Sequence, residues 1–247
     1  MAEVPREIMR KEILILGSTV IAVIAIAVIG SNYYISSLES VRKGTGSAAV
    51  TGTANPDPNG SPIASATLLV RPDSSAIGPE NAKVTLVEFY DPECHTCAAF
   101  GPIVKKILDL HEGRLKFVVR YLPQHTNSEL AVSFTEAAGE QGKYWEARDL
   151  LFARQKEWGT QLGSTPDPAK PKASDLFNKY AEELGLDTTK IARAISEGRF
   201  QAKIEQDKKD AKELGVRKTP SFFVNGRELA SFGEPQLRHL VNQEMNK

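Results

Sequence analysis

The sequence is poor in cysteine, with only two, Cys94 and Cys97, among its 247 residues. A disulfide between residues so close in the chain closes a tiny loop, which restricts the unfolded chain little. Disulfide bonds are therefore excluded as a major source of stability for this fold. A pair of cysteines that does little for stability is expected to be there for its chemistry.

The sequence also lacks an excess of charge of either sign, because 31 basic residues balance 31 acidic ones. This balance gives no electrostatic reason to expect nucleic acid as a partner. Histidine is scarce as well, whereas a structural zinc site needs four cysteine or histidine ligands. His111, His125 and His239 are scattered and form no second pair of ligands beside the cysteines. We therefore expect neither a metal site nor another cofactor.

Charge is missing altogether from the 23 residues at positions 13–35. As a helix this segment is about 35 Å long, which is enough to cross the apolar core of a membrane. Three basic residues precede it, Arg6, Arg10 and Lys11, and positively charged flanks stay on the cytoplasmic side. The sequence therefore predicts a cytoplasmic segment over residues 1–12 and a transmembrane helix over residues 13–35.

A cleaved secretory signal peptide is the alternative interpretation of this apolar segment. The stretch is long for such a peptide, and no Ala-x-Ala cleavage site follows it. Both interpretations place the rest of the chain outside the cytoplasm, where disulfides persist.

Residues 36–70 are rich in Ser, Gly, Ala, Thr, Asn and Pro and show no apolar periodicity. This composition predicts a flexible linker with a mean reach of roughly 30 Å. The remaining residues, 71–247, are numerous enough to form one well-packed domain.

Apolar spacing within residues 71–247 predicts alternating strands and helices. The expected elements are, in order, a strand over Val84–Tyr90, a helix from Cys94 to about His111, a strand over Leu115–Leu122, a helical block over about 126–214, a strand over Pro220–Val224, a hairpin turn at Asn225-Gly226, a return strand over Arg227–Ala230 and a helix over about Glu234–Met245. The first helix is expected to turn five side chains toward the core: Ile103, Val104, Ile107, Leu108 and Leu110. This order predicts an α/β fold, in which helices cover both faces of a mixed sheet and a helical subdomain is inserted.

The segment Cys94-His-Thr-Cys97 follows the first predicted strand and opens the first predicted helix. Cys94 is thus expected at a helix N-terminus, where free N–H groups and the helix dipole favour an anion. The spacing of three residues brings both sulfurs within bonding reach. His95 lies beside them, and a protonated imidazole would further favour a thiolate; an exposed His95 without a catalytic role is the alternative. A thiolate of low pKa attacks disulfides and is also a good leaving group.

The segment from Val84 to Pro102, Val-Thr-Leu-Val-Glu-Phe-Tyr-Asp-Pro-Glu-Cys-His-Thr-Cys-Ala-Ala-Phe-Gly-Pro, resembles the active-site strand and helix of the thioredoxin superfamily. With its helical insertion, the chain is similar to the DsbA-like branch of thiol–disulfide oxidoreductases, which includes membrane-anchored members. The resemblance covers roughly residues 71–247. It implies a thioredoxin fold, with Cys94 as the attacking cysteine, Cys97 as the buried resolving cysteine, and a redox-active disulfide between them.

The resemblance also implies roles for three further residues. Glu88 matches the family's buried acid, which moves a proton to and from the resolving cysteine. The alternative is a solvent-facing strand residue, although a charge inside a covered strand is costly unless it has a role. Thr219-Pro220 matches the cis-proline that faces the cysteines and shapes the substrate groove; an ordinary trans turn is the alternative.

The dipeptide between the two cysteines tunes the redox potential in this family, so the resemblance implies that role for His95-Thr96. Because this dipeptide matches neither the Pro-His of oxidising members nor the Gly-Pro of thioredoxin, the direction of catalysis stays open. A location outside the cytoplasm favours oxidation of protein thiols, with a membrane redox partner that regenerates the cysteine pair. A reductase or isomerase is one alternative, and a reductase would need electrons passed across the membrane. A non-catalytic, chaperone-like module that binds extended chains is another.

Overall fold

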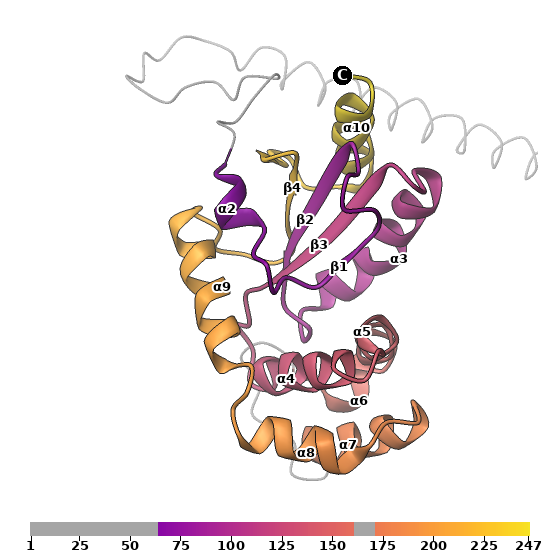
Figure 1. Ribbon diagram of the computed structural model, residues 1–247, viewed down its shortest axis with the longest axis vertical. Coiled ribbons are helices and arrows are strands. Elements are labelled where there is room, and N and C mark those ends of the chain that lie inside the picture. The colour runs from indigo at the N-terminus through magenta and orange to yellow at the C-terminus, as the bar shows by residue number, and fades with distance from the viewer. Residues whose placement is uncertain (1–63, 161–170) are drawn as a thin grey trace, which may run out of the picture. The chain divides into compact units, whose positions relative to one another are not determined.

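The computed structural model describes residues 64–160 and 171–247 (Figure 1). The predicted cytoplasmic segment at 1–12, the transmembrane helix at 13–35 and most of the linker at 36–70 lie outside the described residues. Within the described ranges, no helix is both long and apolar enough to span a membrane.

The folded domain begins before residue 71, where the linker was expected to end. Residues Ala66–Leu69 form a short helix, α2, and the side chain of Leu69 is buried. Leu69 belongs to the same hydrophobic cluster as Val87 and Phe89 of the sheet. The last residues of the predicted linker are therefore part of the domain. A single helical turn is too short to show a periodic apolar pattern in the sequence.

Five strands among the described residues form one mixed sheet in the order β1-β3-β2-β4-β5. The strands are β1 (Ala76–Ile77), β2 (Val84–Tyr90), β3 (Leu115–Tyr121), β4 (Ser221–Val224) and β5 (Arg227–Glu228). β2 and β3 run parallel and are joined by helix α3 (His95–Leu110), whereas the other three pairings are antiparallel. The predicted hairpin turn joins β4 to β5, and both Asn225 and Gly226 have positive φ, at 47° and 83°, as such turns require.

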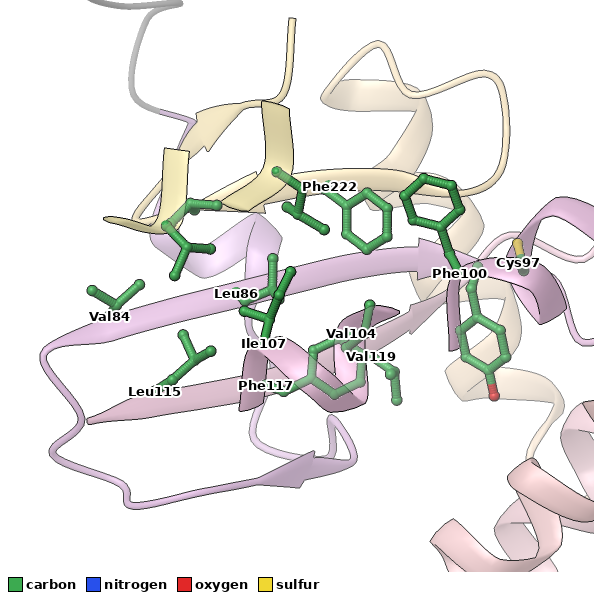
Figure 2. Packing of buried hydrophobic residues seen from close by; sticks show 14 of the residues in the cluster. Val84, Leu86, Cys97, Phe100, Val104, Ile107, Leu115, Phe117, Val119 and Phe222 are labelled. Atoms are coloured by element: carbon green, nitrogen blue, oxygen red, sulfur yellow. The ribbon is translucent and has the colours of Figure 1, made fainter. Parts of the chain in front are cut away.

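Helices cover both faces of the sheet, as predicted (Figure 1). Helix α3 and the C-terminal helix α10 (Glu234–Met245) lie on one face, and α2 and α9 (Gln201–Glu213) lie on the other. Because side chains alternate along a strand, Leu86 and Tyr90 of β2 face α3, whereas Val87 and Phe89 face the opposite side. Figure 2 shows the first of these clusters, in which Cys97 packs with residues of β2, β3 and α3. The cysteine pair is thus anchored to the hydrophobic core.

Helix α3 buries Val104 and Ile107 and partly buries Ile103 and Leu108. Leu110, however, is 64% exposed, so the prediction that it faces the core is wrong. At the last residue of a helix, burial depends on whether a neighbouring element reaches that far, and the spacing of apolar residues does not show this.

Six helices of the described chain lie between β3 and β4, in agreement with the predicted helical insertion. They are α4 (Ser128–Gly139), α5 (Tyr144–Ala153), α6 (Gln155–Trp158), α7 (Ala173–Glu183), α8 (Thr188–Ser196) and α9. Phe134, Trp158 and Phe177 pack together in a core that is separate from those of the sheet. The insertion is therefore a subdomain with its own hydrophobic interior.

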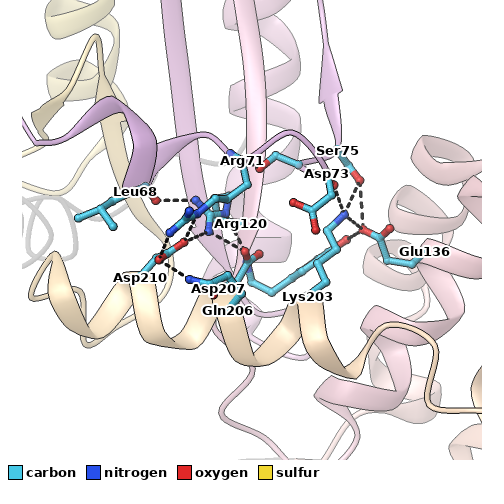
Figure 3. A network of polar contacts seen from close by, with 12 residues as sticks. Leu68, Arg71, Asp73, Ser75, Arg120, Glu136, Lys203, Gln206, Asp207 and Asp210 are labelled. Atoms are coloured by element: carbon cyan, nitrogen blue, oxygen red, sulfur yellow. Dashed lines mark hydrogen bonds and ion pairs between the residues drawn. The ribbon is translucent and has the colours of Figure 1, made fainter.

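A buried ion-pair network joins α9 to the sheet (Figure 3). Arg120 of β3 is fully buried and donates to Asp207 at 2.6 and 2.8 Å and to Asp210 at 2.6 Å. It also donates to the backbone carbonyl of Leu68 at 2.5 Å, and Arg71 forms a second ion pair with Asp210 at 2.6 Å. One guanidinium thus holds β3, the end of the insertion and the start of the domain together.

Candidate functional site

The two cysteines lie at the N-terminus of α3, directly after β2. Cys94 is the N-cap residue, and its N–H donates to the carbonyl oxygen of Asp91 at 3.1 Å. Cys94 is 8% exposed, whereas Cys97, one turn further into the helix, is 0% exposed. Both cysteines are free in the structure, so the disulfide between them stays a prediction. One sulfur is thus close to the surface, and the other is enclosed in the core.

The surroundings of Cys94 lower the pKa of its thiol from 9.0 to about 5. A hydrogen bond from Cys97 is the largest cause, and burial opposes it. The side chain of Thr219 and the backbone N–H groups of Cys97 and Thr96 provide further hydrogen bonds to the sulfur. These N–H groups are available because the first turn of a helix leaves its donors unpaired. Cys94 is therefore a thiolate at neutral pH.

Cys97 shows the opposite behaviour, since burial raises the pKa of its thiol well above the usual value. The hydrogen bond with Cys94 and the negative charges of Glu88 and Cys94 raise the pKa of Cys97 further. Cys97 therefore keeps its proton at neutral pH. In such a pair, the sulfur of Cys94 can form a disulfide with a substrate and leave it again as a thiolate. The thiol of Cys97 can then form the disulfide bond with Cys94 that releases the substrate.

The loop before β4 lies against Cys94. The thiol of Cys94 is 3.5 Å from the carbonyl oxygen of Thr219, and the Thr219–Pro220 peptide bond is cis. Pro220 is buried, and two residues later the ring of Phe222 packs 5.8 Å from that of Phe100 in α3. The structure thus brings Thr219 and Pro220 to the cysteine pair, as the family resemblance implied. Their part in substrate binding stays a prediction.

Glu88 is fully buried on the face of β2 that α3 covers. Burial raises the pKa of the Glu88 carboxyl to about 7, while the positive charge of Arg148 opposes this shift. The Nη2 atom of Arg148, a residue of α5, donates to Oε2 of Glu88 at 3.1 Å. Glu88 is therefore a buried acid rather than a solvent-facing strand residue.

The side chains of His95 and Thr96 are exposed, and both residues lie in the first turn of α3, directly after Cys94. Thr96 acts on Cys94 through its backbone N–H. An effect of the His95 imidazole on the thiolate stays a prediction.

A buried carboxylate, Asp91, fixes the loop between β2 and α3. Asp91 accepts hydrogen bonds from the N–H of Glu93 at 2.8 Å, the N–H of Gln124 at 2.7 Å and the hydroxyl of Ser128 at 2.5 Å. The Nδ1 atom of His125 also lies 2.7 Å from it. Asp91 thus ties the loop that carries Cys94 to the start of the insertion.

Sequence reasoning missed this anchor, because Asp91-Pro92-Glu93 lies between the predicted strand, which ends at Tyr90, and the predicted helix, which begins at Cys94, and it shows no apolar pattern. Glu93 is buried as well and accepts from the N–H groups of Asn127 and Thr160 at 2.7 and 2.5 Å. Two acidic residues between a buried strand and the cysteine pair were the available signal. Arg148 was missed too, since it lies in another element 60 positions from Glu88.

Across residues 64–160 and 171–247, no group of three or more His, Cys, Asp or Glu side chains could hold a metal ion.

Comparison with solved structures identifies proteins of the same architecture. A thioredoxin-like oxidoreductase from Silicibacter pomeroyi is 27% identical, with a TM-score of 0.61 over 74% of this chain and 99% of that chain. BdbD from Bacillus subtilis is 21% identical, with a TM-score of 0.60 over 70% of this chain and 94% of that one. The alpha-DsbA1 protein of Wolbachia pipientis is 20% identical, with a TM-score of 0.60 over 72% and 92% of the two chains.

Relatives found by sequence comparison are named as antiporters and not as oxidoreductases. A protein of Salinispora tropica named Na(+)/H(+) antiporter NhaA 3 is 36% identical over 162 residues, which cover 64% of this chain and 22% of that protein. A protein of Herminiimonas arsenicoxydans named Na(+)/H(+) antiporter NhaA is 34% identical over 152 residues, covering 62% and 22%. The chain therefore spans about a fifth of the length of these relatives.

A family model described as Thioredoxin matches residues 71–243, which is most of the chain. This match, the mixed sheet and the cysteine pair at the start of α3 agree with one another. The chain belongs to the thioredoxin family and has the DsbA-like architecture of that family's thiol–disulfide oxidoreductases.

Proposed function

We propose that this protein is a membrane-tethered thiol–disulfide oxidoreductase that oxidises protein thiols outside the cytoplasm. The observation that carries the proposal is the contrast between the two cysteines. Cys94 has a pKa of about 5 and a sulfur near the surface, whereas Cys97 is fully buried with a pKa well above the usual value. This contrast suits a sulfur that exchanges with substrates and a sulfur that does not.

In the proposed reaction a substrate thiolate attacks Cys94 of the oxidised pair. The Cys94–Cys97 bond breaks, a disulfide between substrate and Cys94 forms, and Cys97 leaves and takes a proton. A second substrate thiolate then attacks the first substrate sulfur, which releases Cys94 as a thiolate. Two electrons pass from the substrate to the cysteine pair.

The low pKa of Cys94 supports oxidation as the direction. A stable thiolate stabilises the reduced pair relative to its disulfide, and a disulfide that is easily reduced is a strong oxidant. In the reverse direction the same stability works against the enzyme as a reductant. A reductase or isomerase remains the alternative outcome of the test below.

The location and the partners are proposed from the sequence. The uncharged segment at 13–35 and its basic flank support an anchor with the domain outside the cytoplasm. Proteins with exposed thiols are the proposed substrates, bound beside Thr219 and Pro220, and a membrane redox partner is proposed to reoxidise the pair. The antiporter relatives match over about a fifth of their length, so ion exchange is not part of this proposal.

Equilibration of the purified protein with glutathione buffers tests the direction. We expect a reduction potential closer to that of DsbA, about −120 mV, than to that of thioredoxin, about −270 mV. A value near that of thioredoxin would favour the reductase. Cys94→Ser is expected to abolish oxidation of a dithiol peptide, while Cys97→Ser should trap a mixed disulfide. Full oxidase activity of Cys94→Ser would contradict this mechanism. If the unchanged protein shows no oxidase activity, and a variant without both cysteines binds unfolded protein as well as it does, the chaperone-like binding module is supported instead.

A further inference from the structure

The helical insertion contributes one charged side chain to the interior of the thioredoxin fold. Arg148 of α5 is buried, and its Nη2 atom lies 3.1 Å from Oε2 of Glu88 in β2. A buried charge is costly unless a partner of opposite charge compensates it. Glu88 is the buried partner of Arg148. A second acidic residue, Asp149, is exposed and lies farther away, with its carboxylate 3.6 Å from Nη1 of Arg148. The insertion and the sheet thus share a buried ion pair.

Aromatic rings hold the guanidinium group of Arg148 in place. Its central carbon lies 4.8 Å from the ring centroid of Phe152, 5.1 Å from Tyr90, 5.7 Å from Phe117 and 5.8 Å from Trp145. The faces of such rings attract a cation, so they stabilise the charged form of Arg148 without a hydrogen bond. The side chain also borders a cavity of about 450 Å³ between α3 and α5.

The other neighbours of Glu88 carry no positive charge. In the sheet, its register partners are Val119 of β3 and Phe222 of β4. The titratable groups that interact with it are Cys94, the N-cap of α3, Cys97 within α3 and Tyr90 from its own strand. Among the described residues, Arg148 is the only cation paired with Glu88. Glu88 Oε2 accepts from Arg148, whereas Oε1 has no hydrogen-bond partner in the described structure.

We infer that Arg148 is a positioning residue that holds the carboxylate of Glu88 ready to exchange a proton with Cys97. The inference rests on the proposed function, because it concerns the resolving step of the same cysteine pair. In that step Cys97 gives its proton to the Glu88 carboxylate, and its thiolate attacks Cys94 Sγ in a mixed disulfide. The Cys94–Cys97 bond forms and the bond to the partner sulfur breaks, so the partner leaves as a thiolate. In the oxidative direction the proton returns from Glu88 to Cys97.

Removal of the positive charge should keep Glu88 protonated to higher pH. Burial already raises the pKa of Glu88 to about 7, and Arg148 is the main group that opposes this rise. Without the guanidinium, less of the proton-accepting carboxylate is present at neutral pH. The resolving step should then be slow at pH 7 and should recover at alkaline pH.

The test follows the resolving step with oxidised glutathione as the probe. Reduced protein forms a mixed disulfide with glutathione, and acid quenching with mass spectrometry measures how fast that adduct is lost. In the unchanged protein, we expect the rate to rise with a midpoint near pH 7. In Arg148→Met, the midpoint should move up by at least one pH unit, so the rate at low pH falls about tenfold. Arg148→Lys should restore much of the rate.

Two controls separate charge from packing. Arg154→Met removes an arginine near the end of the same helix that pairs with Glu183 at the surface, and it should keep the original midpoint. Glu88→Gln should abolish the rise of the resolving rate near pH 7, both in the unchanged protein and in Arg148→Met. If Arg148→Met does not fold, Arg148→Gln, which keeps a polar side chain without the charge, is judged by the same criterion.

A direct readout does not require turnover. The infrared band of the protonated carboxyl, assigned by its absence in Glu88→Gln, should persist to higher pH in Arg148→Met than in the unchanged protein. An unshifted rate midpoint and an unshifted band in a folded variant would overturn the inference. If the unchanged protein forms no mixed disulfide with glutathione at all, the proposed function fails instead.

Discussion

Two thiols three positions apart have opposite acidity in this protein. Hydrogen bonds from Cys97, Thr219 and the first helical turn stabilise the thiolate of Cys94, whereas burial among apolar side chains keeps Cys97 protonated. The difference arises from position alone, since both residues are cysteines. The chemistry of the pair therefore depends on where the helix begins relative to the core.

The acidity of Cys94 can be measured through the ultraviolet absorbance of its thiolate. We expect a midpoint at about pH 5, with the alkylation rate reaching a plateau above it. Cys97→Ala should move the pKa of Cys94 upward, because the hydrogen bond from Cys97 is the largest stabilising cause. Cys94→Ser should remove the transition. A midpoint near 9 in the unchanged protein would contradict the assignment.

The buried carboxyl of Glu88 links stability to pH. Its pKa is 4.5 in the unfolded chain and about 7 in the folded protein, so the folded state binds the proton more tightly. The protonated Glu88 carboxyl therefore favours the folded state. This contribution to the unfolding free energy is fully present below pH 4.5 and is lost as the pH rises to about 7. Relative to Glu88→Gln, the unfolding free energy should fall by about 3 kcal/mol across this window. Urea unfolding of both proteins at several pH values measures this difference, and parallel pH profiles would refute it.

At the scale of elements, the loop between β2 and α3 is held from outside the sheet. Asp91 and Glu93 accept hydrogen bonds from the start of the insertion, and both side chains are buried. The N-terminus of α3, and with it Cys94, is thus oriented by the insertion as well as by the strand. This arrangement gives the helical block a direct structural role at the candidate site.

Asp91→Ala should therefore destabilise the domain and loosen the loop. The variant leaves the N–H groups of Glu93 and Gln124 without their acceptor, and unpaired buried donors are costly. We expect a loss of about 2–4 kcal/mol in unfolding free energy, with faster amide exchange at Cys94. Asp109→Ala is the matched control, since Asp109 is 62% exposed and pairs with Lys105 at the surface of α3. Equal losses in both variants would argue against the anchor.

For the whole domain, the ion-pair network at Arg120 connects segments that are far apart in the sequence. It joins β3 to α9, the last helix of the insertion, and to the backbone of Leu68 at the start of the domain (Figure 3). The insertion is thus secured at both ends, by Asp91 at its beginning and by Asp207 and Asp210 at its end.

Arg120→Met should cost about 3–5 kcal/mol of unfolding free energy, because it leaves the buried carboxylate of Asp207 without its cation and leaves Asp210 paired with Arg71 alone. Arg199→Met is the control, since Arg199 is 39% exposed and forms surface ion pairs with Glu140 and Glu197, so its loss should change the unfolding free energy little. Thermal or chemical unfolding of the two variants compares them. A cost for Arg120→Met as small as that of the control would contradict the role of the network.

Several parts of this structure were predictable from local sequence. The span of β2, the start of α3, the hairpin at Asn225-Gly226 and the final helix all follow from patterns of neighbouring residues. Alternation of apolar residues, helical spacing and turn-forming residues act over a few positions, so the sequence alone carries this information. The cysteine pair was located in the same way.

Only the tertiary structure decided the environment of the candidate site. Arg148 reaches Glu88 from another element, Asp91 finds its partners beyond β3, and α2 joins the domain only through its contacts with the sheet. Desolvation and hydrogen bonding depend on which distant segments pack together, and these two effects set the acidity of Cys94, Cys97 and Glu88. The identity of the reactive residues is thus local in the sequence, whereas their reactivity is a property of the folded domain.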